Sequence, residues 1–124
     1  MARLYLTRRA LLDVDEVDRY SVERWGDKVA GRYLNDIQAG LQRLSDSPSL
    51  LREQPEYSLR LRFYRVREHL LVCDVVGETV FVLALRHGSM DLPRRIAELE
   101  PQLVDEAELL HARIVKRGAG PMDR

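Results

Sequence analysis

The stretch that decides the fold is TVFVLALRHGSMDLP, residues 79–93 of this 124-residue chain. Its first half, 79–85, is an unbroken run rich in β-branched and aromatic side chains, which predicts a buried strand. The strand leads into Arg86 and His87. We therefore expect these two side chains at the end of a strand, at the edge of a sheet, where a functional site can form.

The residues after that strand predict a turn and then a helix. Gly88 and Asp91 supply turn and helix N-cap chemistry, and Pro93 is tolerated in the first turn of a helix. Residues 92–117 follow with helical periodicity, and Pro101 predicts a kink or a fresh start within them.

The residues before that strand predict two more strands. The segment 69–76 is nearly all apolar, and Gly77-Glu78 forms a plausible two-residue hairpin turn into the final strand. Earlier still, apolar and polar residues alternate over 59–64, which predicts a strand with one solvent-exposed face. Residues 48–57 predict a polar connection before it. Strands that are apolar on both faces require cover on both sides.

The first third of the chain predicts a pair of helices. Thr7 can cap a helix that runs to about Trp25, with an inward stripe that begins at Leu11. Gly26 ends that helix, and the next one has a clear apolar period over 30–44. We expect an antiparallel helical hairpin that covers one sheet face, with Trp25 anchored in the core at its corner.

These elements predict an α+β domain with the order β-α-α-β-β-β and an added C-terminal helix. The sheet is expected to be antiparallel, with about four strands and the helical hairpin on one face. We expect residues 1–94 to form the main domain, 95–117 a helical extension of it and 118–124 a flexible tail. The extension is a candidate to cover the second sheet face.

Composition limits the classes of function. Twenty basic and twenty acidic residues cancel, which argues against strong direct binding of nucleic acid. The chain has no glycine-rich phosphate loop and no Cys/His ligand cluster, so we expect neither a cofactor nor a metal. The single cysteine, Cys73, cannot form an internal disulfide. No apolar run approaches the ~20 residues of a membrane span, and we expect no membrane association and a cytoplasmic location.

A local basic patch is predicted on the alternating strand. It consists of Arg60, Arg62, Arg65 and Arg67 around Tyr64. Arginine beside tyrosine is typical of interface hot spots, which makes these residues candidates for binding a target protein. A solvated strand edge kept soluble by its charge is an equal alternative.

Arg86 and His87 admit three interpretations. A ribonuclease needs an acid, a base and cations around the scissile phosphate, and Arg62, Arg86 and His87 are the candidates for that chemistry. Adjacent strand residues point to opposite faces, so Arg86 and His87 can act together only if the strand ends there. His87 can instead be a hydrogen-bonded turn residue, or it can contact a partner.

The order of elements and several local signatures resemble the ParE branch of the RelE/ParE toxin superfamily. The similar segments are Glu23-Arg24-Trp25-Gly26, Arg32-Tyr33-Leu34, Leu61-Arg62, Gly77 with Thr79-Val80, and His87-Gly88, within residues 3–94. The resemblance implies a toxin of a type II toxin–antitoxin system. Such a toxin inhibits DNA gyrase by binding and is neutralised by a cognate antitoxin, with no enzymatic step.

The resemblance also leaves two alternatives open. RelE relatives cut mRNA on the ribosome, so a ribosome-dependent endoribonuclease is one of them. The other is a non-toxic or self-masked protein, because Cys73, Phe81 and Ala84 depart from the family's usual residues toward better-covered strands. In that case the C-terminal helix docks on its own sheet or builds a homodimer.

Overall fold

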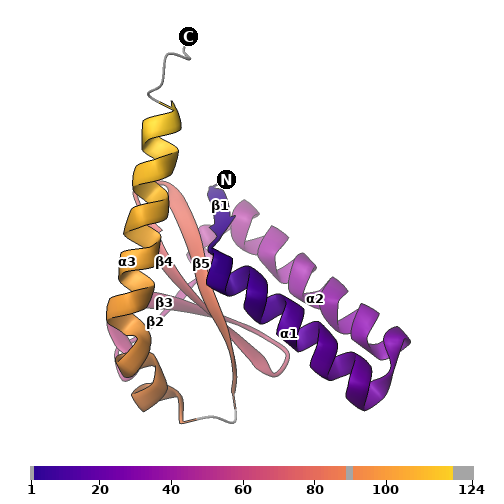
Figure 1. Ribbon diagram of the computed structural model, residues 1–124. Helices are drawn as coiled ribbons and strands as arrows, with labels where there is room; N and C mark the ends of the chain where they lie inside the picture. The colour runs from indigo at the N-terminus through magenta and orange to yellow at the C-terminus, as the bar shows by residue number, and fades with distance from the viewer. Residues whose placement is uncertain (1, 89–90, 119–124) are drawn as a thin grey trace.

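The computed structural model describes residues 2–88 and 91–118 and confirms the α+β class (Figure 1). Ser89, Met90 and the expected tail beyond Gly118 lie outside the described residues. Along the chain the elements are β1 (Arg3–Leu6), α1 (Arg8–Trp25), α2 (Asp27–Asp46), the 3₁₀ turn η1 (Pro48–Leu50), β2 (Arg52–Gln54), β3 (Ser58–Val66), β4 (His69–Val76), β5 (Thr79–His87) and α3 (Leu92–Gly118).

The sheet has five strands in the order β1-β5-β4-β3-β2. β1 runs parallel to β5, and the remaining neighbours are antiparallel. The sheet is therefore mixed and has one strand more than expected. The additional strand is β2, which lies within residues 48–57. That segment was expected to be a connection because three polar residues show no alternation from which a strand could be predicted.

The β4–β5 hairpin forms as predicted and contains one irregularity. Gly77 adopts a φ of 63° in its turn, a conformation that favours glycine. Farther along, Cys73 pairs with Val82 while Val72 pairs with Ala84, so Leu83 is an extra residue in β5. Because of this bulge, Leu83 and Ala84 both join the core on the same side of the sheet.

The helical hairpin covers the opposite face of the sheet, as predicted. The Thr7 hydroxyl accepts from the Ala10 amide at 3.2 Å, so the expected cap forms. Ala10 points inward, whereas Leu11 is 57% exposed, so the inward stripe begins one residue earlier than predicted. Its later members, Val14, Val17 and Ser21, do face the core. Trp25 is 52% exposed and packs on Tyr20, so its expected place in the core was wrong.

The helix α3 covers the second face of the sheet (Figure 1). Its Ile96, Leu103 and Ala107 side chains are fully buried in one cluster with Phe81 and Leu83. α3 is a single helix, and Pro101 lies inside it rather than at a fresh start. The C-terminal extension therefore docks on the sheet of its own chain, which is one of the two arrangements expected for it.

The unusual apolar residues of the sheet divide between its two faces. Phe81 and Ala84 are buried beneath α3, which explains their apolar character. Cys73 belongs instead to the cluster under the helical hairpin. Burial raises the pKa of its thiol far above the ordinary range, so the thiol stays protonated and inert.

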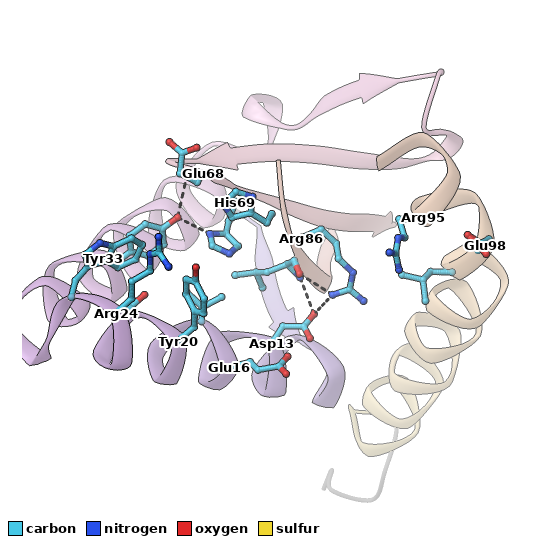
Figure 2. Close-up of a pocket in the computed structure, with 16 residues that line it drawn as sticks. Asp13, Glu16, Tyr20, Arg24, Tyr33, Glu68, His69, Arg86, Arg95 and Glu98 are labelled. Carbon is cyan, nitrogen blue, oxygen red and sulfur yellow. Dashed lines mark hydrogen bonds and ion pairs between the residues drawn. The ribbon is translucent and has the colours of Figure 1, made fainter. Parts of the chain in front are cut away.

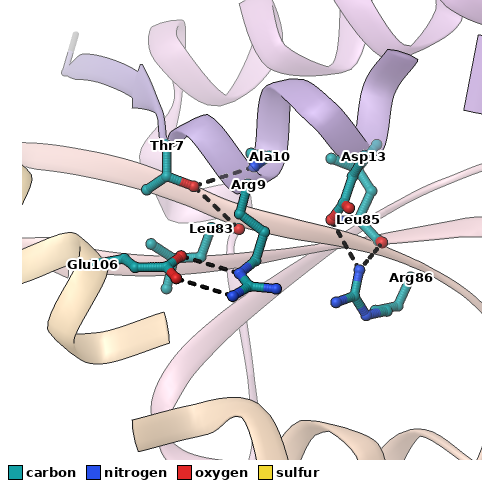
Figure 3. A network of polar contacts seen from close by, with 8 residues as sticks. All are labelled: Thr7, Arg9, Ala10, Asp13, Leu83, Leu85, Arg86 and Glu106. Carbon is teal, nitrogen blue, oxygen red and sulfur yellow. Dashed lines mark hydrogen bonds and ion pairs between the residues drawn. The ribbon is translucent and has the colours of Figure 1, made fainter. Parts of the chain in front are cut away.

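Polar contacts hold α3 to the rest of the molecule (Figure 3). Arg9 of α1 donates two hydrogen bonds to Glu106, each 3.0 Å long. On β3, the Arg60 guanidinium bridges Asp74 at 2.8 Å and Glu108 of α3 at 3.6 Å. With the apolar burial, these contacts make α3 an integral layer of the fold.

Candidate interaction site

A hollow of about 1060 Å³ opens where β5 ends, between the C-terminal half of α1 and the first turns of α3 (Figure 2). Its lining includes Asp13, Tyr20, His69, Arg86, His87 and Arg95. The strand β5 ends at His87, and this is the condition under which neighbouring strand residues can share a site. The structure therefore brings Arg86 and His87 to one hollow.

The free edge of β5 forms part of this site. β1 pairs with β5 only as far as Val82, and no other strand among the described residues, 2–88 and 91–118, lies beside the last residues of β5 on that side. The Asp13 carboxylate accepts the Leu85 amide at 3.0 Å and the Arg86 guanidinium at 2.8 Å (Figure 3). Arg86 also donates to the Leu85 carbonyl at 2.8 Å. The Asp13–Arg86 pair thus occupies the backbone groups that an added strand would use.

A pair formed by the buried Tyr33 and the half-buried His69 lies beside this edge (Figure 2). The Tyr33 hydroxyl accepts the Glu68 amide at 3.2 Å and lies 2.6 Å from Nδ1 of His69. Burial, and secondarily the charge of His87, lowers the pKa of His69 to about 4. His69 is therefore neutral near pH 7 and too weak a base for general catalysis there.

An exposed aromatic pair forms the outer rim of the hollow. Tyr20 and Trp25 are 56% and 52% exposed, and their rings meet edge to face at 5.9 Å. The Arg24 guanidinium lies 5.7 Å from the centre of the Trp25 ring. Tyrosine, tryptophan and arginine are the residue types that dominate binding energy in protein interfaces. Sequence analysis missed this rim because Trp25 was assigned to the core.

Asp13 was also missed, although the sequence held a signal for it. It lies three residues after the buried Ala10 and one residue before Val14, on the inward side of α1. A carboxylate on a buried helix face requires a partner, and Arg86 is the partner that the fold supplies.

The residues of the predicted basic patch do not gather in one place. Arg60 is bound to Asp74 and Glu108, and Arg62 pairs with Glu53 of β2 at 3.6 Å. Tyr64 accepts a 2.9 Å hydrogen bond from Arg43 of α2. Arg65 donates to the Arg67 carbonyl at 3.0 Å, and its guanidinium lies against Gly88. Each of these four side chains is therefore engaged by a different partner along β3.

The three residues proposed for ribonuclease chemistry are likewise not brought together. Arg62 does not line the hollow that holds Arg86 and His87, and Arg86 is neutralised by Asp13. In the described residues, 2–88 and 91–118, no group of three or more His, Cys, Asp or Glu side chains is placed to hold a metal ion. No helix in that part of the chain is both long and apolar enough to cross a membrane.

Comparison with known proteins places this architecture in a family. A family model described as the ParE toxin of the type II toxin–antitoxin system parDE matches residues 4–92. Toxin ParE of Escherichia coli is 30% identical over 99 residues, which cover 79% of this chain and 96% of that protein. Toxin ParE3 of Caulobacter vibrioides is 33% identical over 98 residues, 79% of this chain and 98% of that protein.

A solved structure titled as the chromosomal ParDE TA system from P. aeruginosa has the same fold. Its chain superposes with a TM-score of 0.63 at 20% identity, covering 70% of this chain and 96% of that one. The family match ends at Leu92, where α3 begins, so α3 lies almost wholly beyond the matched region. On the family model and on these two relatives, the chain belongs to the ParE toxin family of type II toxin–antitoxin systems.

Proposed function

We propose that this protein inhibits DNA gyrase by binding it in the bacterial cytoplasm, and that a cognate antitoxin neutralises it. Membership of the ParE family over residues 4–92 is the observation that carries the proposal. The hollow at the end of β5 supports binding rather than catalysis, because Arg86 is held by Asp13 and His69 is kept neutral.

The binding surface that we propose extends from the hollow to its aromatic rim. Arg86 and His87 lie inside, and the exposed Tyr20 and Trp25 lie at the edge. Their exposed ring faces offer a large contact area at little ordering cost, as interface anchors do. Arg60, Arg62, Tyr64 and Arg65 remain secondary candidates, each already engaged by a neighbouring side chain or carbonyl.

The test is to induce the protein briefly in bacteria that lack the antitoxin, and to follow DNA and protein synthesis by pulse labelling. We expect DNA synthesis to fall, with a DNA-damage response, while translation continues. Co-expression of the cognate antitoxin should restore growth. An immediate collapse of translation with cleaved mRNA would overturn the proposal and favour the ribosome-dependent endoribonuclease.

Variants locate the surface in the same assay and in a gyrase supercoiling assay. Trp25→Ala and Tyr20→Ala should weaken inhibition at least tenfold, since truncating a hot-spot residue commonly costs about 2 kcal/mol of binding free energy. Leu59→Ala is the matched control, because Leu59 is 88% exposed and lies on β3 outside the hollow. Equal inhibition by all three variants would contradict this assignment of the surface.

A further inference from the structure

A second hollow, of about 480 Å³, lies between the start of α1 and the C-terminal half of α3. We call it the α1–α3 groove; its lining includes Arg8, Leu12, Glu106, Leu109 and Arg113. Leu12 and Leu109 are apolar but 58% and 57% exposed. Large apolar side chains that line one groove while exposed to water are typical of a docking surface.

The charges around the α1–α3 groove are unequal. Both of its carboxylates are neutralised inside the protein, Glu106 by Arg9 and Asp13 by Arg86. Arg8 and Arg113 are exposed, and neither forms an ion pair with any of the described residues. The groove therefore has an apolar floor and a rim with uncompensated positive charge.

We propose that the α1–α3 groove binds an acidic, amphipathic segment of the antitoxin; this inference rests on the proposed function above. Apolar side chains of the segment pack between Leu12 and Leu109, and flanking carboxylates reach Arg8 and Arg113. A groove between two helices suits a segment with apolar residues along one side. The paired positive rim selects for acidic partners and speeds their association.

The rim charge argues against a second copy of this chain as the occupant. A two-fold dimer places the same patch of both subunits together. The uncompensated Arg8 and Arg113 would then oppose the same cations of the second copy, which is unfavourable. An acidic partner would instead be attracted electrostatically to the same rim.

The groove also gives this toxin a means to select its own antitoxin. One wall is α3, which follows the region matched by the family model, residues 4–92. An antitoxin segment that contacts Leu109 and Arg113 therefore contacts residues beyond the matched region. We infer that α3 contributes to specificity between this antitoxin and those of related toxins.

The test measures affinity for the purified antitoxin encoded beside the toxin gene, using the full-length toxin. The variant is Arg8→Glu/Arg113→Glu, and the matched control is Arg19→Glu/Arg94→Glu. The control changes the same two helices by the same charge, at side chains 69% and 70% exposed that line neither hollow. We expect the groove variant to raise the Kd at least tenfold, and the control to change it less than threefold.

Salt and folding measurements complete the test. The difference between groove variant and wild type should shrink as ionic strength rises, because salt screens exposed charges. Thermal melts should show both double variants folded. Equal affinities for the groove variant and the control would overturn the inference while leaving the proposed function intact. A wild-type dimer that the groove variant dissolves would also overturn it, in favour of a second copy. If the antitoxin fails to bind wild-type toxin at all, the proposed function itself is overturned.

Discussion

At the scale of single residues, Gly40 shows how closely α2 packs on the sheet. A Cβ on Gly40 would lie 2.6 Å from Cγ2 of Val66, which is 4% exposed on β3. A valine side chain is stiff, so either helix or strand must shift to admit the methyl group. We predict that Gly40→Ala lowers the free energy of unfolding by about 1–3 kcal/mol, measured by urea denaturation.

Gly31→Ala is the matched control in the same helix. A Cβ at Gly31 meets nothing within 4 Å, so the substitution only replaces glycine with a better helix former. It should raise the free energy of unfolding by about 0.5–1 kcal/mol. Stability changes of the same sign in both variants would contradict the close approach at Gly40.

The half-buried His69 predicts a pH dependence of stability. Its pKa falls from the ordinary 6.5 to about 4 in the folded protein, first because of burial and then because of His87. Between these values the unfolded chain binds a proton that the folded chain does not. Stability is therefore complete above pH 6.5 and is lost as the pH falls toward 4. We expect a loss of about 1–2 kcal/mol by pH 5, discounted because the ring is partly exposed.

The measurement compares wild type with His69→Gln by urea denaturation at about pH 7.5 and about pH 5. Glu68 and Asp13 also act on this ring, in the opposite direction, and they are present in both proteins. The stability advantage of wild type over the variant should shrink at the lower pH. A constant difference between the two proteins would show that His69 does not titrate as described.

At the scale of elements, α3 is expected to act as a core layer. Leu103 is fully buried, whereas Leu109 of the same helix is 57% exposed. We predict that Leu103→Ala costs about 2–5 kcal/mol of unfolding free energy and that Leu109→Ala costs less than about 0.5 kcal/mol. Thermal or urea melts distinguish these results, and similar costs at both positions would mean that α3 is not packed as described.

The same burial changes how a truncation must be interpreted. Removing residues 101–124 deletes Leu103 and Ala107 and exposes Phe81 and Leu83. Such a chain loses core, so its lack of toxicity would report unfolding rather than the role of α3. Point variants on a folded protein are the sounder probe of masking.

Sequence periodicity predicted the elements that have long, regular apolar patterns. The α2 stripe and the β4–β5 hairpin were found because their patterns extend over many residues. β2 was missed because three polar residues carry no period, and the parallel pairing of β1 with β5 was missed because it joins distant segments. The bulge at Leu83 was equally invisible, since nothing local distinguishes it from regular strand.

The site was predictable only in part, for a related reason. Arg86 and His87 were found because a strand end is visible in sequence. The role of Asp13 depends on an ion pair across 73 positions of the chain, to Arg86. The exposure of Trp25 depends on how the hairpin corner sits against the sheet, and an amphipathic pattern does not specify that position.

At the scale of the whole molecule, the question is whether α3 masks a functional face or completes the fold. The Arg9–Glu106 clamp joins α3 to α1 through two 3.0 Å hydrogen bonds, with side chains 26% and 31% exposed. We predict a coupling energy of about 1 kcal/mol in a double-mutant cycle to alanine. The exposed Asp15–Arg19 pair, at 3.7 Å, is the control and should give about 0.5 kcal/mol or less.

The same clamp variants decide between masking and structure when growth inhibition is measured at equal protein levels. If α3 were a mask, Arg9→Ala and Glu106→Ala would loosen it and increase toxicity. We expect no increase, because Ile96, Leu103 and Ala107 hold α3 on the sheet independently of the clamp. Burial of these side chains stabilises the docked helix by several kcal/mol, more than the clamp supplies. A rise in toxicity that follows the loss of the clamp would instead favour the self-masked toxin.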